Sequence, residues 1–81
     1  MAYETKITGI VDPKKFITYL FHFPTFYQEV DNPRAVKDLV LVRRKRSLDP
    51  WTSSRMSYVD ALNMYHRKVR QGFEPISKHI H

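Results

Sequence analysis

The chain has 81 residues, a net charge of +6, no Cys and only two Gly. The lack of cysteine excludes disulfides, thiol nucleophiles and thiolate metal sites, and two glycines are too few for a glycine-rich phosphate-binding loop. A chain this short forms one domain at most and buries only about 60% of its unfolded surface, so we expect its five Phe, five Tyr and one Trp to supply the core.

The start of the chain predicts one strand and one helix. Residues 2–11 alternate loosely between apolar and polar side chains, which is typical of a short strand, with a free N-terminal arm as the alternative. Asp12-Pro13 is a good helix start, because Asp caps helices and Pro fits the first helical position. The apolar residues that follow have helical spacing up to Pro24, which ends or kinks the element; they are Phe16, Tyr19, Leu20 and Phe23.

The middle of the chain is ambiguous between helix and strand. Asp31-Asn32-Pro33 predicts a turn or a second helix cap. The apolar run from Leu39 to Val42 is rich in β-branched residues, which slightly favours a buried strand over about Asp38–Arg44. A turn at Ser47–Pro50 follows it.

The clearest pattern predicts a helix over about Arg55–Gln71. Ser53 or Ser54 is placed to cap it, and an apolar stripe then repeats at steps of three and four residues. Gly72 suits the position just after the helix. We therefore expect a small α+β domain over 1–81, with about two short strands, two or three helices, a long C-terminal amphipathic helix and an extended tail at 73–81.

Charge and aromatic residues lie in different parts of the chain. Residues 33–81 hold eleven Lys or Arg against four Asp or Glu, whereas residues 1–32 hold three against four and most of the aromatic rings. Such a positive field attracts nucleic acid, anionic membranes or acidic protein surfaces. The aromatic density near the N-terminus exceeds what so small a core easily buries, which predicts exposed anchoring rings there.

The run Arg43–Arg46 is the strongest local feature. Four adjacent cations repel one another unless an anionic surface lies nearby, so the run predicts a partner; the alternative is a solvated strand end that protects a sheet edge. With Ser47 the run also fits a basophilic-kinase site, and alone it fits a nuclear localisation signal or a basic-pair protease site. The residues predicted to contact a partner are Arg43, Arg44, Lys45, Arg46, Trp51, Arg67, Lys68 and Arg70.

Neither catalysis nor metal binding is predicted. No Ser lies in a nucleophile elbow, no carboxylates are paired at helical spacing, and His66 and Asp60 fall on different faces of the predicted helix. His79 and His81 would chelate a metal only if the fold brought them to His22 or His66, so we expect no metal, no cofactor and no enzymatic activity.

Two kinds of binding remain. The favoured one is a basic accessory or structural subunit that docks on a larger protein or ribonucleoprotein assembly, and the alternative is a DNA- or RNA-binding protein that contacts phosphates through its basic cluster. The first ten residues lack the apolar segment of a signal peptide, and no apolar stretch is long enough to span a membrane, which favours an intracellular protein.

Overall fold

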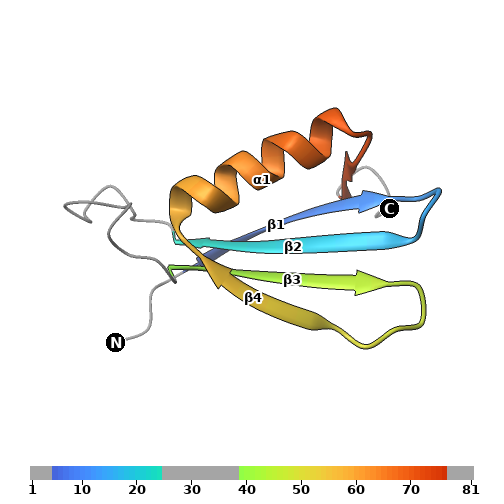
Figure 1. Ribbon diagram of the computed structural model, residues 1–81, viewed down its shortest axis with the longest axis horizontal. Coiled ribbons are helices and arrows are strands. Elements are labelled where there is room, and N and C mark those ends of the chain that lie inside the picture. Colours follow the sequence, from blue (N-terminus) through green and yellow to red (C-terminus); the bar gives the residue numbers. More distant parts are fainter. Residues whose placement is uncertain (1–4, 25–38, 77–81) are drawn as a thin grey trace.

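A computed structural model of the protein describes residues 5–24 and 39–76. Five strands form one antiparallel sheet in the order β4-β3-β2-β1-β5, and the helix α1 lies across one face of it (Figure 1). The elements are β1 (Thr5–Asp12), β2 (Ile17–Pro24), β3 (Val40–Arg46), β4 (Thr52–Met56), α1 (Tyr58–Arg70) and β5 (Glu74–Pro75).

The predicted α+β class, with two or three helices and a long C-terminal one, is wrong. Within the described ranges the protein is mostly a five-stranded antiparallel sheet with one short helix. The largest error concerns the helix expected after Asp12-Pro13, because that segment forms β2. Its apolar run satisfies both a helical and a period-two spacing, and its aromatic residues favour a pleated, buried surface.

Asp12 closes a turn instead of capping a helix. Its Oδ1 accepts hydrogen bonds from the backbone N–H groups of Lys14, at 3.0 Å, and Lys15, at 3.3 Å. An Asp side chain that bonds the backbone two or three residues later stabilises such a turn. The chain therefore reverses at once, and β2 pairs antiparallel with β1 from Ile17 onward.

The predicted strands are confirmed with shifted ends. The strand expected at residues 2–11 is β1, and residues 1–4 lie outside the described ranges. The strand expected at Asp38–Arg44 is β3, whereas the cap or turn expected at Asp31-Asn32-Pro33 lies outside those ranges. From the predicted tail at 73–81, residues Glu74–Pro75 form β5 beside β1, and residues 77–81 are not described.

The helix begins later than predicted. Ser53 and Ser54 lie in β4, and the cap is Ser57, whose Oγ accepts a hydrogen bond from Asp60 N at 3.2 Å. With an acidic residue at the third helical position, this cap also complements the helix dipole. The helix therefore has 13 residues.

Gly72 ends the helix as predicted. Its φ of +110° is the left-handed conformation that favours glycine, and its N–H donates to Val69 O at 3.1 Å. Phe73 N donates to Lys68 O at 3.1 Å, which completes a Schellman motif. The motif turns the chain so that Phe73 is buried beneath the helix end and β5 reaches the sheet.

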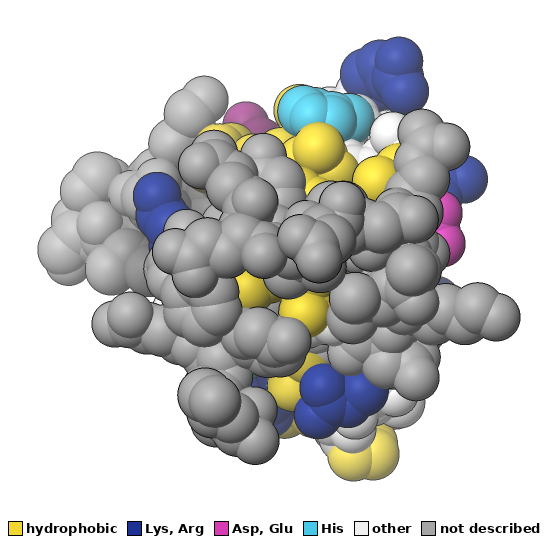
Figure 2. All heavy atoms as spheres, turned by 90° about the vertical axis from the view of Figure 1, so that its left-hand side faces the viewer, with side chains coloured by type: hydrophobic (Ala, Val, Ile, Leu, Met, Phe, Trp, Pro, Cys, Tyr) yellow, Lys and Arg dark blue, Asp and Glu magenta, His cyan; other side chains and the backbone are white. Residues whose placement is uncertain are grey.

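The core lies between the sheet and α1. Its buried members are Ile10, Tyr19, Phe21, Leu39, Val40, Val42, Ala61 and Phe73. Aromatic rings join the layers edge to face, with Tyr65 of α1 5.8 Å from Phe21 and Phe73 5.6 Å from Tyr19, between ring centroids. Figure 2 views the end of the sheet where α1 begins and shows hydrophobic side chains there together with Lys and Arg side chains.

Candidate functional site

The pleat of β3 divides the basic run between the two faces of the sheet. Arg44 lies beside Tyr19 in the register of β3 with β2, and Tyr19 is buried under α1, so Arg44 and Arg46 lie on the helix side. Successive strand residues point to opposite faces. Arg43 and Lys45 therefore lie on the face opposite α1, which we call the far face.

On the far face, two cations lie over the ring of Trp51. Arg43 Cζ is 4.7 Å from the ring centroid and Lys45 Nζ is 5.9 Å from it. Trp51 as a residue remains 38% exposed. These distances are in the range of cation–π attraction, which is worth about 0.5–1 kcal/mol at exposed sites. We call Arg43, Lys45 and Trp51 the tryptophan cluster.

Arg55 extends the positive charge along the far face. It pairs with Leu41 in the register of β3 with β4, on the same face as Arg43, and it is exposed. Among the described strand residues, Glu74 is the only Asp or Glu on this face. It lies on β5, at the opposite edge of the sheet. The edge formed by β3 and β4 is therefore positive.

The other predicted cations lie on the helix side and have different surroundings. Lys68 Nζ lies 5.2 Å from the ring of Tyr19 and 5.7 Å from that of Phe73, so it covers the core. Arg67 and Arg70 are exposed on α1, where they share a shallow hollow with Asp60. The structure thus places three of the eight residues predicted to contact a partner in one cluster and two others, Arg67 and Arg70, together on α1.

Arg44 and His22 each contain a buried nitrogen with no described partner. Arg44 Nε is on the helix side and His22 Nε2 is on the far face. Burial lowers the pKa of His22, and the nearby positive charge of Arg43 lowers it further. This lowering reduces the share of His22 in the positive charge of the face, which its Arg and Lys residues supply.

The histidines do not form a common site. His22 lies on β2 at the far face and His66 is exposed on α1, across the sheet, whereas His79 and His81 lie outside the described ranges. Residues 5–24 and 39–76 contain no group of three His, Cys, Asp or Glu that could hold a metal ion.

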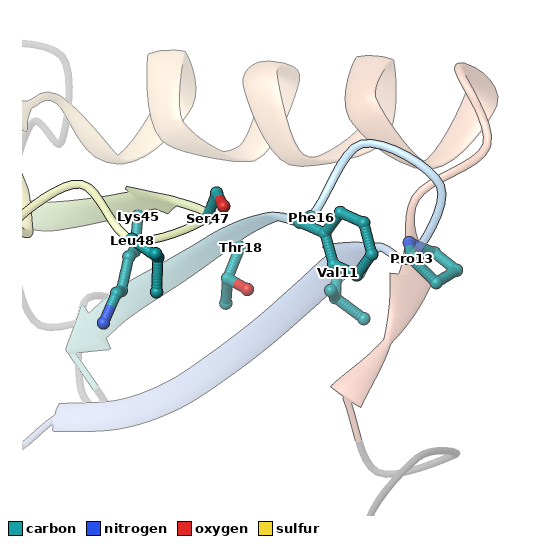
Figure 3. Close-up of a pocket in the computed structure, with 7 residues that line it drawn as sticks. All are labelled: Val11, Pro13, Phe16, Thr18, Lys45, Ser47 and Leu48. Atoms are coloured by element: carbon teal, nitrogen blue, oxygen red, sulfur yellow. The ribbon is translucent and has the colours of Figure 1, made fainter.

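A hollow of about 520 Å³ lies on the far face beside the tips of the two hairpins (Figure 3). Lys45 is the charged residue that lines this hollow, and the other lining residues are Val11, Pro13, Phe16, Thr18, Ser47 and Leu48. Figure 3 shows Val11, Thr18 and Lys45 pointing away from α1. Because Lys45 also lies over Trp51, the hollow adjoins the tryptophan cluster.

Two rim residues of the hollow are unusually exposed for apolar side chains. Phe16 is 68% exposed and Leu48 is 96% exposed. The prediction of exposed aromatic rings near the N-terminus thus applies to Phe16, whereas Tyr19 and Phe21 are buried and Tyr3, Phe26 and Tyr27 are not described.

Sequence reasoning missed Phe16, Leu48 and Arg55 as site residues. Phe16 was placed in a helical stripe, Leu48 in a turn, and Arg55 at a helix start. Once Asp38–Arg44 is taken as a strand, its period of two already separates Arg43 from Arg44. No comparable signal marks Phe16 or Leu48, because their exposure depends on how two hairpin tips meet.

No family model, curated protein or solved structure matches this chain. Among the described residues, no helix is long and apolar enough to cross a membrane.

Proposed function

We propose that the protein binds nucleic acid through the far face of its sheet, with the tryptophan cluster as the contact point. The observation that carries this proposal is the placement of Arg43 and Lys45 over the half-exposed ring of Trp51. Nucleic acid offers the two chemistries that such a cluster recognises, since phosphates attract the cations and bases stack on the indole.

The distribution of charge supports the far face over the helix side. Arg43, Lys45 and Arg55 lie on neighbouring strands, and the described acidic residue of that face lies on the far edge strand. On the helix side, Lys68 lies against Tyr19 and Phe73, and Asp60 shares the hollow of Arg67 and Arg70. Arg67 and Arg70 thus have a carboxylate beside them, whereas β3 and β4 contain no Asp or Glu, and this difference favours phosphate binding on the far face.

Binding without catalysis is the role we infer. Phosphate contacts need only cations in reach, whereas catalysis needs a nucleophile or base held beside a third, orienting group. His22 and His66, the described histidines, lie on opposite sides of the sheet.

A pair of charge variants tests this function. Arg43→Gln with Lys45→Gln removes two cations from the far face, and Arg67→Gln with Arg70→Gln removes two from α1. Binding of a labelled oligonucleotide is measured by fluorescence anisotropy at several salt concentrations, after circular dichroism confirms that both variants are folded. Trp51 is the single tryptophan of the chain, so quenching of its fluorescence reports the same event independently.

We expect the far-face pair to weaken binding by about tenfold or more. We also expect it to flatten the plot of log affinity against log salt by about 1.4 for a single strand, from two phosphate contacts at about 0.7 each. The α1 pair is expected to change affinity by less than about threefold. Absence of binding by the unmodified protein, or equal losses in the two variants, would overturn the proposal.

Docking on a protein partner is the second candidate, favoured by the exposure of Phe16 and Leu48. Nuclease treatment distinguishes the two. A partner protein that stays bound to the full chain after RNA and DNA are digested, and is lost on Phe16→Ser, would support docking on protein.

A further inference from the structure

The tips of the two hairpins are tied together beside the hollow. Ser47 N donates a hydrogen bond of 2.8 Å to Phe16 O, which joins the β1–β2 turn to the β3–β4 loop. Both residues have positive φ, +55° for Phe16 and +50° for Ser47. This region is disfavoured for a bulky side chain, and glycine usually occupies such a place in a hairpin.

The strained backbone of Phe16 does not serve core packing. Phe16 is 68% exposed, so a smaller residue at this place would cost the core little. Backbone strain of this kind concentrates at sites that bind ligands, where the surrounding structure holds it. An aromatic ring is thus kept at the rim of an apolar hollow whose one charged member is Lys45.

We propose that this hollow takes an unpaired base, so that the protein prefers single-stranded over double-stranded nucleic acid. The proposal rests on the nucleic-acid function proposed above and names its substrate class. An aromatic wall and an apolar floor suit the face of any base, and Lys45, shared with the tryptophan cluster, is placed for the adjoining phosphate.

The charges around the hollow favour this occupant over an apolar protein segment. Lys45 lines the hollow, and Lys14 and Lys15 are exposed in the turn that precedes Phe16. An apolar surface and cations are thus found at the same place. A base attached to a phosphate chain matches both features, and the volume of the hollow lies within the roughly 300–1,000 Å³ of small-ligand sites.

Two stacking positions explain why single strands are preferred. A base that stacks on Trp51 and another that enters the hollow must both be free of pairing and of neighbouring stacked bases. In a duplex such bases would first have to be unstacked and unpaired, at a cost in affinity. Phosphate contacts alone make no such distinction.

The substitution Phe16→Gly separates binding from folding. Glycine adopts φ of +55° readily, so the variant is expected to melt no lower than the unmodified protein. Phe16→Asn provides a second variant, because Asn also tolerates this conformation. Ile7→Ser is the matched control, since Ile7 is 57% exposed on the same face and does not line the hollow.

Affinities for a labelled oligothymidine and for its duplex with oligoadenine are measured by fluorescence anisotropy. We expect the unmodified protein to bind the single strand about a hundredfold tighter than the duplex, from two stacked bases at about tenfold each. Phe16→Gly and Phe16→Asn are expected to lower this preference about tenfold, because Trp51 still stacks one base, and to leave duplex binding within about twofold, while Ile7→Ser keeps the full preference.

The outcomes separate the two proposals. Equal affinity of the unmodified protein for both oligonucleotides, or a preference that both Phe16 variants keep undiminished, would overturn the single-strand inference and leave the nucleic-acid function standing. Binding to neither oligonucleotide would overturn both. A nuclease-resistant protein partner lost in both Phe16 variants would assign the hollow to a protein segment and contradict the inference.

Discussion

On the helix side of β2, Tyr19 and Phe21 are buried against α1, whereas on the far face of β3, Arg43 and Lys45 lie over the half-exposed ring of Trp51. Aromatic residues are present on both sides, but they have different neighbours. Rings that meet other rings stabilise the fold. A ring that meets cations and solvent keeps its face and its charges available to a ligand, so the two faces of one sheet divide stability and binding between them.

The largest expected effect is on the helix side. Phe21→Ala removes a fully buried ring, and we expect it to lower the free energy of unfolding by about 3–5 kcal/mol, which is a large part of the stability of so small a protein. Ile7→Ala on the far face is expected to cost under about 1 kcal/mol. Urea denaturation followed by circular dichroism measures the free energy of unfolding of both variants. Similar losses in the two would contradict the division of stability and binding between the two faces.

The next effect is on binding at the far face. Trp51→Ala is expected to weaken oligonucleotide binding by about 1–3 kcal/mol, the value of one stacked base, and to change stability by under about 1 kcal/mol. Leu62→Ala is the control, because Leu62 on α1 has almost the same exposure, 37% against 38%. Anisotropy titrations of the two variants would contradict the account if Trp51→Ala bound as well as Leu62→Ala.

A smaller effect concerns the placement of α1. Ser57→Ala removes the cap that accepts the hydrogen bond from Asp60 N, and we expect it to lower the free energy of unfolding by about 1 kcal/mol with no change in oligonucleotide affinity. Ser53→Ala, in β4, is expected to cost close to nothing. A larger loss of thermal stability in Ser53→Ala than in Ser57→Ala would contradict the cap at Ser57 and support the earlier helix start expected from the sequence.

The smallest effect is a dependence of stability on pH. The folded state lowers the pKa of His22, by burial and by the charge of Arg43, so the unfolded chain binds a proton more readily. Stability is therefore full above the ordinary histidine pKa of about 6.5 and falls as the pH decreases below it. His22→Gln is expected to reduce this fall between about pH 7.5 and 5.5 in urea titrations, and an unchanged slope would show that another group causes it.

The sequence predicted individual elements better than their assembly. β1, β3 and the end of α1 at Gly72 follow from local patterns, namely alternation, a β-branched run and a glycine after a cationic last turn. β2 was mistaken for a helix because Tyr19, Phe21 and Phe23 lie in an almost continuous apolar run, which fits both periods. β4 was missed because residues 52–55 are polar and exposed, as an edge strand allows.

The site was only half predictable for a related reason. Arg43, Lys45 and Trp51 were all named, but as part of a run that included Arg44 and Arg46. The strand β3 places Arg43 and Lys45 on one face of the sheet and Arg44 and Arg46 on the other. The β3–β4 pairing then brings Trp51 to Arg43. The role of Phe16 depends on a positive φ and on a hydrogen bond from Ser47, 31 positions along the chain in the printed sequence, which no local pattern reports.

Mapping a bound oligonucleotide by nuclear magnetic resonance would show which face of the sheet it contacts. The ¹⁵N-labelled full chain is titrated with a short single-stranded oligonucleotide, and the shifts of the backbone amides and the Trp51 indole N–H are followed. We expect the largest shifts at Trp51, at Arg43 and Lys45 in β3 and along β4, with small shifts on α1. Largest shifts at Arg67 and Arg70, or no shifts at all, would contradict it.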